Sequence, residues 1–121
     1  MLVAVQLHSF SRDAGRRIDA HSSDFVLTPL TDPEGTAWAA CVHLGPGESI
    51  GEHPAVGGQL LCVVTGEGWV SGDDGVRVPI RAMQAAHWAT GERHATGTDA
   101  GLVAIVLEGD GLAVAAPRLS V

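Results

Sequence analysis

The sequence is poor in positive charge and in aromatic side chains, and it has no long hydrophobic run. Its 7 Lys and Arg residues stand against 14 Asp and Glu residues, which gives a formal net charge of −7. Without a basic stripe, we expect no binding to nucleic acid or to an anionic membrane surface. No apolar stretch approaches the ~18 residues of a membrane-spanning helix, and no basic segment precedes an apolar one as in a secretory signal. These absences predict a cytoplasmic protein.

Cysteine is equally scarce. The two cysteines, Cys41 and Cys62, each lie inside an apolar, strand-like run. A small buried thiol is the usual role of such a residue, and a disulfide would require the two strands to be neighbours. The paired Cys spacing of a zinc site is missing. We therefore expect two free, buried thiols.

The composition favours short strands joined by tight turns. Hydrophobic residues make up 45% of the 121 residues, and 16 glycines punctuate the chain. No segment of about ten residues has convincing helical periodicity. The length suits one domain over residues 1–121. We predict an all-β, closed or nearly closed barrel of antiparallel strands, with under about 10% helix.

Apolar, β-branched segments bounded by turn residues give the expected strands. Gly66-Glu67-Gly68 is predicted to form a tight hairpin turn, and Gly72 to Gly75 a second turn. The expected strands are Met1–Leu7 at a sheet edge, Phe25–Leu30, Ala37–Leu44, Leu60–Val64, Trp69–Ser71, Val76–Ile80, Ala85–Ala89 and Leu102–Leu107.

The stretch from Gly45 to Gly68 resembles the first motif of the cupin superfamily, Gly-x5-His-x-His-x3-4-Glu-x6-Gly. Gly45 opens the motif, His53 takes the second His, and Gly66 closes it. Two positions differ, because Gly51 stands where the first His belongs and Gln59 replaces the acid. The gap from His53 to Gln59 is also longer, at five residues.

Met83 to Thr98 is similar to the second cupin motif, Gly-x5-Pro-x-Gly-x2-His-x3-Asn. Gly91 and His94 are kept, whereas Met83, Ala89 and Thr98 replace the Gly, Pro and Asn. The resemblance implies the double-stranded β-helix, or jelly-roll, fold and a divalent metal such as Zn, Ni, Fe or Mn. The matching ligands are His53, His94 and, through its amide oxygen, Gln59. The alternative is that these side chains only form hydrogen bonds inside the barrel mouth.

Other residues extend or modify this site. His87 or His43 would replace the missing imidazole if its strand face points inward, while His8 and His21 are expected to be solvent-exposed. Trp88 would give a planar organic ligand an apolar platform if it faces the cavity. Because Gly51 and Gln59 are expected to border the barrel mouth, larger side chains there should be tolerated better than in the core.

Three kinds of function fit these features. The first is a small metal-dependent enzyme acting on an organic molecule inside the barrel. The second is a metal-free module that binds or senses a small molecule. The third is a structural, dimer-forming accessory protein. For any of the three we expect a homodimer, because Met1–Leu7 and Leu102–Leu107 offer more apolar surface than one small barrel covers, and cupins commonly pair through sheet edges. Fold alone does not choose among these functions.

Overall fold

The computed structural model of the chain describes residues 5–32 and 34–119, and its regular structure is almost entirely β. The described residues form two single-turn 3-10 helices, η1 (Arg12–Ala14) and η2 (Ala20–Ser22), and no α-helix. This confirms the all-β prediction. The strands are β1 (Arg16–Ile18), β2 (Phe25–Pro29), β3 (Trp38–Leu44), β4 (Ser49–Pro54), β5 (Gly58–Ser71), β6 (Val78–Arg81), β7 (Ala85–Trp88), β8 (Arg93–Gly97) and β9 (Leu102–Gly109).

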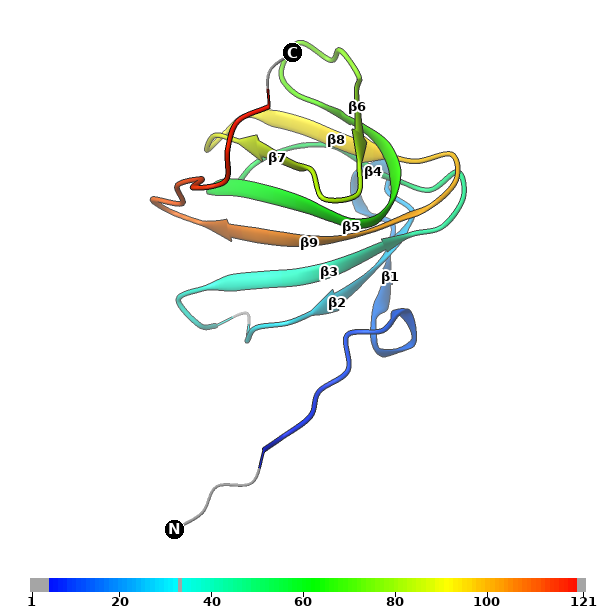
Figure 1. Cartoon of the computed structure of the whole chain (residues 1–121), viewed down its shortest axis with the longest axis vertical. Helices are drawn as coiled ribbons and strands as arrows, with labels where there is room; N and C mark the ends of the chain where they lie inside the picture. The colour runs from blue at the N-terminus through cyan, green and yellow to red at the C-terminus, as the bar shows by residue number, and fades with distance from the viewer. Residues whose placement is uncertain (1–4, 33, 120–121) are drawn as a thin grey trace.

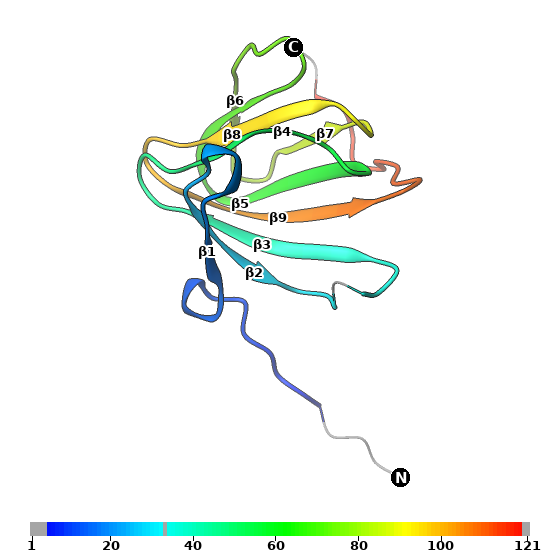
Figure 2. The ribbon, with the colours of Figure 1, turned by 180° about the vertical axis from the view of Figure 1, so that it is seen from behind.

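The strands form a curled antiparallel sheet that folds over itself into two layers (Figures 1 and 2). Hydrogen-bonded neighbours follow the order β1-β2-β3-β9-β5-β8-β4, and β6 and β7 also pair with β5. The first half of β5 pairs with β9 and β7, and its second half pairs with β6 and β8. Strand β5 therefore belongs to both layers, and it is the element on which the barrel is built.

The core lies between the two layers and follows strand alternation. On β3, Val42 and Leu44 belong to the core cluster, which identifies the face that they share with Ala40 as the inward one. Cys41 is buried on the opposite face. The same alternation of period two places Leu61 and Val63 of β5 inward. The core cluster consists of Phe25, Val42, Leu44, Leu61, Val63, Ile80, Trp88, Leu102, Ala104 and Val106.

The predicted hairpin turn at Gly66-Glu67-Gly68 is wrong, because β5 runs without a break through these residues. The strand instead bends there, after a bulge between Val63 and Thr65. Gly66 has φ +83°, and a Cβ on it would approach the carbonyl oxygen of Gly101 closely. A Cβ on Gly68 would meet the carbonyl oxygen of Gly97 in the same way. The glycines let two backbones approach each other, which is how one strand passes between layers.

The N-terminal region differs from the expected edge strand. Met1–Ala4 lie outside the described residues, and residues 5–7 form no strand. Residues 5–9 instead extend away from the barrel (Figure 1). The first strand is β1, which lies in a part of the chain where we predicted no strand. Strand β6 also begins at Val78, two residues later than predicted.

A set of charged side chains ties the segment before β2 to the barrel. Glu48 forms ion pairs with Arg12 at 3.3 Å and with Arg17 at 2.6 Å, and it accepts a hydrogen bond from the backbone nitrogen of Gly45. Burial raises the pKa of Glu48, but the hydrogen bonds from Gly45, Arg17 and Arg12 outweigh it and leave this pKa lowered. The carboxylate therefore stays charged and holds in place the segment that carries η2.

None of the helices in the described residues has the length and apolar character needed to cross a membrane.

Candidate functional site

His53 and His94 are side by side, as their places in the two motifs predicted. They occupy paired positions on the antiparallel strands β4 and β8, and their ring centroids lie 4.3 Å apart. The His53 side chain is half-buried, whereas His94 is only 2% exposed. The pairing of β4 with β8 thus brings together two imidazoles that lie 41 residues apart in the sequence.

Both rings are held by the same kind of hydrogen bond. His53 Nδ1 lies 2.8 Å from the carbonyl oxygen of Gly51, and His94 Nδ1 lies 3.1 Å from that of Glu92. A carbonyl oxygen only accepts, so each neutral ring carries its proton on Nδ1 and has a lone pair on Nε2. Among the described residues, His94 Nε2 is buried and has no hydrogen-bond partner. The site therefore presents two imidazole acceptors whose tautomers the backbone has fixed.

Burial keeps His94 neutral. Desolvation lowers the pKa of His94, and the nearby His53 acts in the same direction. The hydrogen bond to Glu92 and the charges of Glu108 and Glu92 raise this pKa but do not outweigh burial. Neutral imidazole is the form that binds a metal or accepts a hydrogen bond.

Trp88 forms one wall of the site. Its ring stacks on His94 with centroids 4.5 Å apart and planes at 29°. Its Nε1 donates a hydrogen bond of 3.1 Å to the carbonyl oxygen of Ser71, and the side chain is 4% exposed. Trp88 thus faces the interior and supports His94, while its use as a platform for an organic ligand stays a prediction.

Gln59 lies on the inward face of β5 and is 9% exposed. Its Nε2 is 3.3 Å from Glu108 Oε1 of β9. Because a carboxylate only accepts, this contact assigns the amide nitrogen to Glu108 and leaves the amide oxygen as the ligand-capable atom. Gln59 is paired in the sheet with Glu108 of β9 on one side and with Trp88 of β7 on the other, and Glu108 is paired with Trp38 of β3. We call these four residues the interior row: Trp38, Glu108, Gln59 and Trp88.

The position of the missing first His is filled by backbone from another part of the chain. A Cβ on Gly51 would clash with the carbonyl oxygen of His21 in η2. The Gly51 nitrogen donates to Ser23 Oγ at 2.9 Å, which fixes this close approach. Figure 2 shows the segment between β1 and β2 beside β4. The expectation that Gly51 tolerates a larger side chain is therefore wrong.

Segment η2 is strained and brings a third imidazole to the site. His21 has φ 56° and Ser22 has φ 59°, left-handed backbone values that residues other than glycine rarely adopt. The exposed His21 ring stacks on His53 with centroids 5.4 Å apart and planes at 17°. Ring lone pairs lie in the ring plane, so two nearly parallel rings do not aim at one ion. His21 covers His53 in this arrangement and does not replace the lost ligand.

The other histidines lie elsewhere. His87 is exposed on β7, on the face opposite to Trp88, so it does not point into the barrel. His43 lies on the outward face of β3, where its Nε2 is 3.0 Å from the carbonyl oxygen of Phe10. His8 is exposed, as predicted. Neither His87 nor His43 supplies the missing imidazole.

The two cysteines are free, as expected. Cys41 is buried and Cys62 half-buried, and burial raises the pKa of both thiols. Strand β9 separates their strands β3 and β5, so neither a disulfide nor a shared metal site is available to them. Across residues 5–32 and 34–119, no group of three or more His, Cys, Asp or Glu side chains is arranged to hold a metal ion. The structure thus brings together His53 and His94, and it places Gln59 beside Trp88, the residue that stacks on His94.

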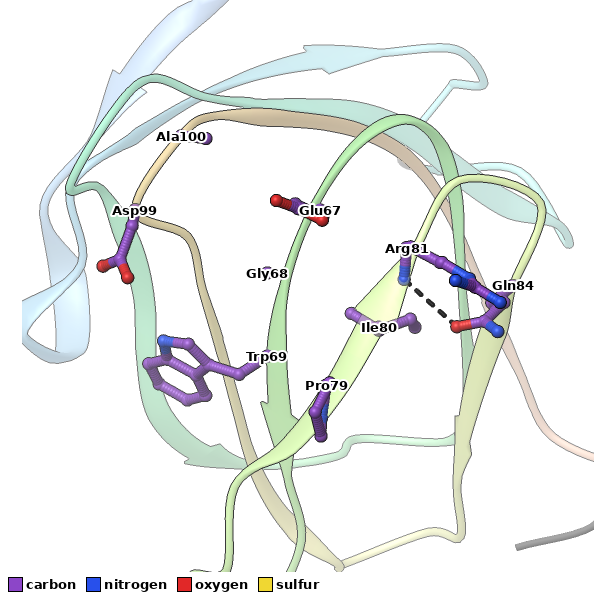
Figure 3. Close-up of a pocket in the computed structure, with 9 residues that line it drawn as sticks. All are labelled: Glu67, Gly68, Trp69, Pro79, Ile80, Arg81, Gln84, Asp99 and Ala100. Atoms are coloured by element: carbon purple, nitrogen blue, oxygen red, sulfur yellow. Dashed lines mark hydrogen bonds between the residues drawn. The ribbon is translucent and has the colours of Figure 1, made fainter.

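A pocket of about 500 Å³ opens on another part of the barrel (Figure 3). Its lining includes Glu67, Trp69, Arg81 and Asp99. The backbone nitrogen of Arg81 donates a hydrogen bond of 3.1 Å to Gln84 Oε1. The Trp69 ring also carries the Arg77 guanidinium 3.8 Å from its centroid. Charges of both signs line the pocket, and its lining contains neither His53 nor His94. We assign no ligand to it.

Sequence reasoning missed two residues of the site, Glu108 and His21. Glu108 follows Leu102, Ala104 and Val106 at alternate positions of β9, so strand periodicity alone places it inward. That strand was predicted to end at Leu107. No local sequence pattern predicts that His21 contacts His53, because this contact depends on a loop of unusual backbone conformation.

Several solved structures share this architecture. The Cupin 2 conserved barrel domain protein from Salinispora arenicola has a TM-score of 0.74 and 20% identity, over 90% of this chain and 92% of that one. A predicted oxalate decarboxylase from Thermotoga maritima has a TM-score of 0.70 and 22% identity, over 83% and 96%. An uncharacterized protein with a double-stranded β-helix domain from Klebsiella pneumoniae has a TM-score of 0.68 and 18% identity, over 90% and 95%.

No protein-family model matches the sequence, and no curated protein matches it. At identities of 22% and below, the likeness to these structures establishes a shared fold.

Proposed function

We propose that this protein, which has the double-stranded β-helix fold of the cupins, binds a divalent metal ion and a small organic molecule inside its barrel. The ion would be held by Nε2 of His53, Nε2 of His94 and the amide oxygen of Gln59. The observation that carries this proposal is His94 Nε2, a buried acceptor without a partner among the described residues. A buried polar atom of this kind costs free energy unless something binds it.

The donor set suits such an ion. Metal-ligating histidines usually donate their second ring nitrogen to a carbonyl or carboxylate, as His53 and His94 do here. Imidazole nitrogens bind Zn, Ni, Fe and Mn, while an amide oxygen is a weaker ligand without charge. Three protein ligands leave positions for water or an organic ligand, and the bound ion would supply Lewis-acid chemistry there. The chain's own part is to fix both tautomers and to exclude water from His94.

A second candidate function is metal-free binding of a small molecule. It is favoured by the lack, within the described ranges, of a preformed group of three His, Cys, Asp or Glu ligands. In this case an O–H or N–H group of the organic ligand would donate to His94 Nε2. Trp88 and Trp38, which lie at the two ends of the interior row, would contact the apolar part of the ligand.

Metal titration into three variants separates these functions. We expect protein prepared without chelators or a metal-affinity tag to bind one Ni²⁺ or Zn²⁺ per chain by calorimetry. His53→Ala and His94→Ala should each weaken binding at least tenfold, or about 1.4 kcal/mol. His87→Ala is the matched control, because it removes an exposed imidazole from a neighbouring strand.

Two outcomes would contradict the proposed metal site. Equal affinity in all the variants would place the ion elsewhere on the protein. No binding by the wild-type protein would leave the metal-free function as the better account. Circular dichroism of each variant confirms that a lost affinity is not a lost fold.

A further inference from the structure

Glu108 is an acidic residue on the inward face of the barrel. Leu102, Ala104 and Val106 precede it at alternate positions of β9, and all three are buried. Glu108 itself is half-buried, opposite Gln59 on β5 and Trp38 on β3. The strand thus carries a carboxylate to the same interior row as Gln59.

No basic side chain neutralises this carboxylate. Across the described residues, the ion pairs use the acids Asp24, Glu48 and Glu52 and leave Glu108 out. Its hydrogen-bond partner is the Gln59 amide, which is neutral. A half-buried carboxylate without a basic partner attracts a cation placed beside it. Its position in the interior row therefore favours a positively charged occupant over an anion.

The neighbouring groups are acceptors as well. His53 and His94 offer Nε2 lone pairs, and Gln59 offers its amide oxygen once its nitrogen is committed to Glu108. Such a set lacks a donor that would suit an anion. Charge and hydrogen-bonding capacity agree that the occupant is a cation.

We propose that Glu108 is a positioning residue of this site. It holds the Gln59 amide by its nitrogen, so that the oxygen is free for a ligand. It also supplies, from β9, a negative charge that the neutral Gln59 on β5 cannot supply. The inference rests on the proposed metal function and names the residue that makes the site selective for cations.

Variants of the Gln59–Glu108 pair test the charge. Glu108→Gln keeps the shape and an acceptor oxygen but removes the charge, and we expect it to weaken Ni²⁺ binding at least tenfold. The double variant Gln59→Glu with Glu108→Gln returns one carboxylate to the same pair across β5 and β9, and it should restore affinity. Asp110→Asn is the control, since it removes an equal charge from an exposed residue just beyond β9.

The hydrogen bond is tested without metal. Glu108→Leu removes both charge and acceptor, so the side-chain amide signals of Gln59 in a ¹⁵N–¹H spectrum should move toward the values of a free amide. The same signals in Asp110→Asn should stay at their wild-type positions.

Each outcome decides a separate part of the inference. Unchanged Ni²⁺ affinity in Glu108→Gln would overturn the role of the charge, and unchanged Gln59 signals in Glu108→Leu would overturn the positioning. A wild-type protein that binds no metal would overturn the proposed function and the charge role together. The Gln59 signals would still decide whether Glu108 positions the amide.

Discussion

The His94 ring is almost completely buried, and this couples its protonation to folding. Burial lowers the pKa of His94 in the folded chain, whereas the unfolded chain titrates near the usual value of about 6.5. Below that pH the unfolded state takes up a proton that the folded state resists, so stability falls as pH drops through this range until the folded pKa is reached. We expect the melting temperature of metal-free protein to decrease from about pH 7 to pH 5 by this mechanism.

Two variants isolate the contribution of His94 to this pH dependence. His94→Gln cannot titrate, so its melting temperature should depend less on pH than that of the wild type. His87→Gln removes an exposed imidazole and should keep the wild-type slope. If His94→Gln and wild type share one slope over this pH range, another group controls the acid sensitivity.

At the same scale, sequence reasoning located the residues that belong to a motif and missed those that do not. The resemblance to the two cupin motifs singled out His53 and His94, and the register of β4 and β8 does pair them. Strand alternation would have placed Glu108 inward, but the predicted strand ended with the apolar run at Leu107, whereas β9 extends to Gly109. His21 was not, since its contact with His53 depends on two left-handed residues far from the motif.

Among the elements, η2 has the most direct effect on the site. Its His21 carbonyl occupies the space beside Gly51, where any side chain would clash with backbone. We expect Gly51→Ala to destabilise the fold by about 1–3 kcal/mol, the usual cost of overpacking, measured by urea unfolding. Gly109→Ala should be nearly neutral, because a Cβ there meets nothing within 4 Å. Equal stability of the two variants would show that η2 moves aside at little cost.

Strand β5 shows why an element boundary resisted prediction. Gly66-Glu67-Gly68 has the composition of a hairpin turn, and local sequence gives no sign of the backbones of Gly97 and Gly101 that pack against it. The glycines are required by tertiary contacts and not by a chain reversal. Local rules therefore broke one long strand into two expected strands, Leu60–Val64 and Trp69–Ser71.

For the molecule as a whole, composition and periodicity were sufficient to predict an antiparallel β-barrel, and the resemblance to the cupin motifs supplied the double-stranded β-helix. Alternating apolar residues fix which face of each strand is buried, and short strands without helical periodicity lead to a barrel of two layers. The order of strands was beyond these rules. Strand β9 lies between β3 and β5 because of long-range pairing that no local segment specifies.

The predicted homodimer requires an apolar contact surface, and the outward side of β5 and β9 offers one. Five apolar side chains point outward there and are half-buried or exposed, and we call them the outer apolar face: Leu60, Cys62, Val103, Ile105 and Leu107. Leu107 is 38% exposed. Contiguous apolar surface of this kind commonly marks a contact with another protein. A second copy of the chain is the simplest partner, because two identical faces match about a two-fold axis.

We therefore expect a homodimer, with a mass by light scattering of twice 12.4 kDa at micromolar concentration. Leu107→Glu places a charge on the outer apolar face, where a dimer contact would bury it without a partner, and should give a folded monomer of 12.4 kDa. Val76→Glu makes a similar change at an exposed residue between β5 and β6 and should leave the dimer intact. A wild-type monomer would contradict the prediction, and dissociation by Val76→Glu alone would move the contact away from the outer apolar face.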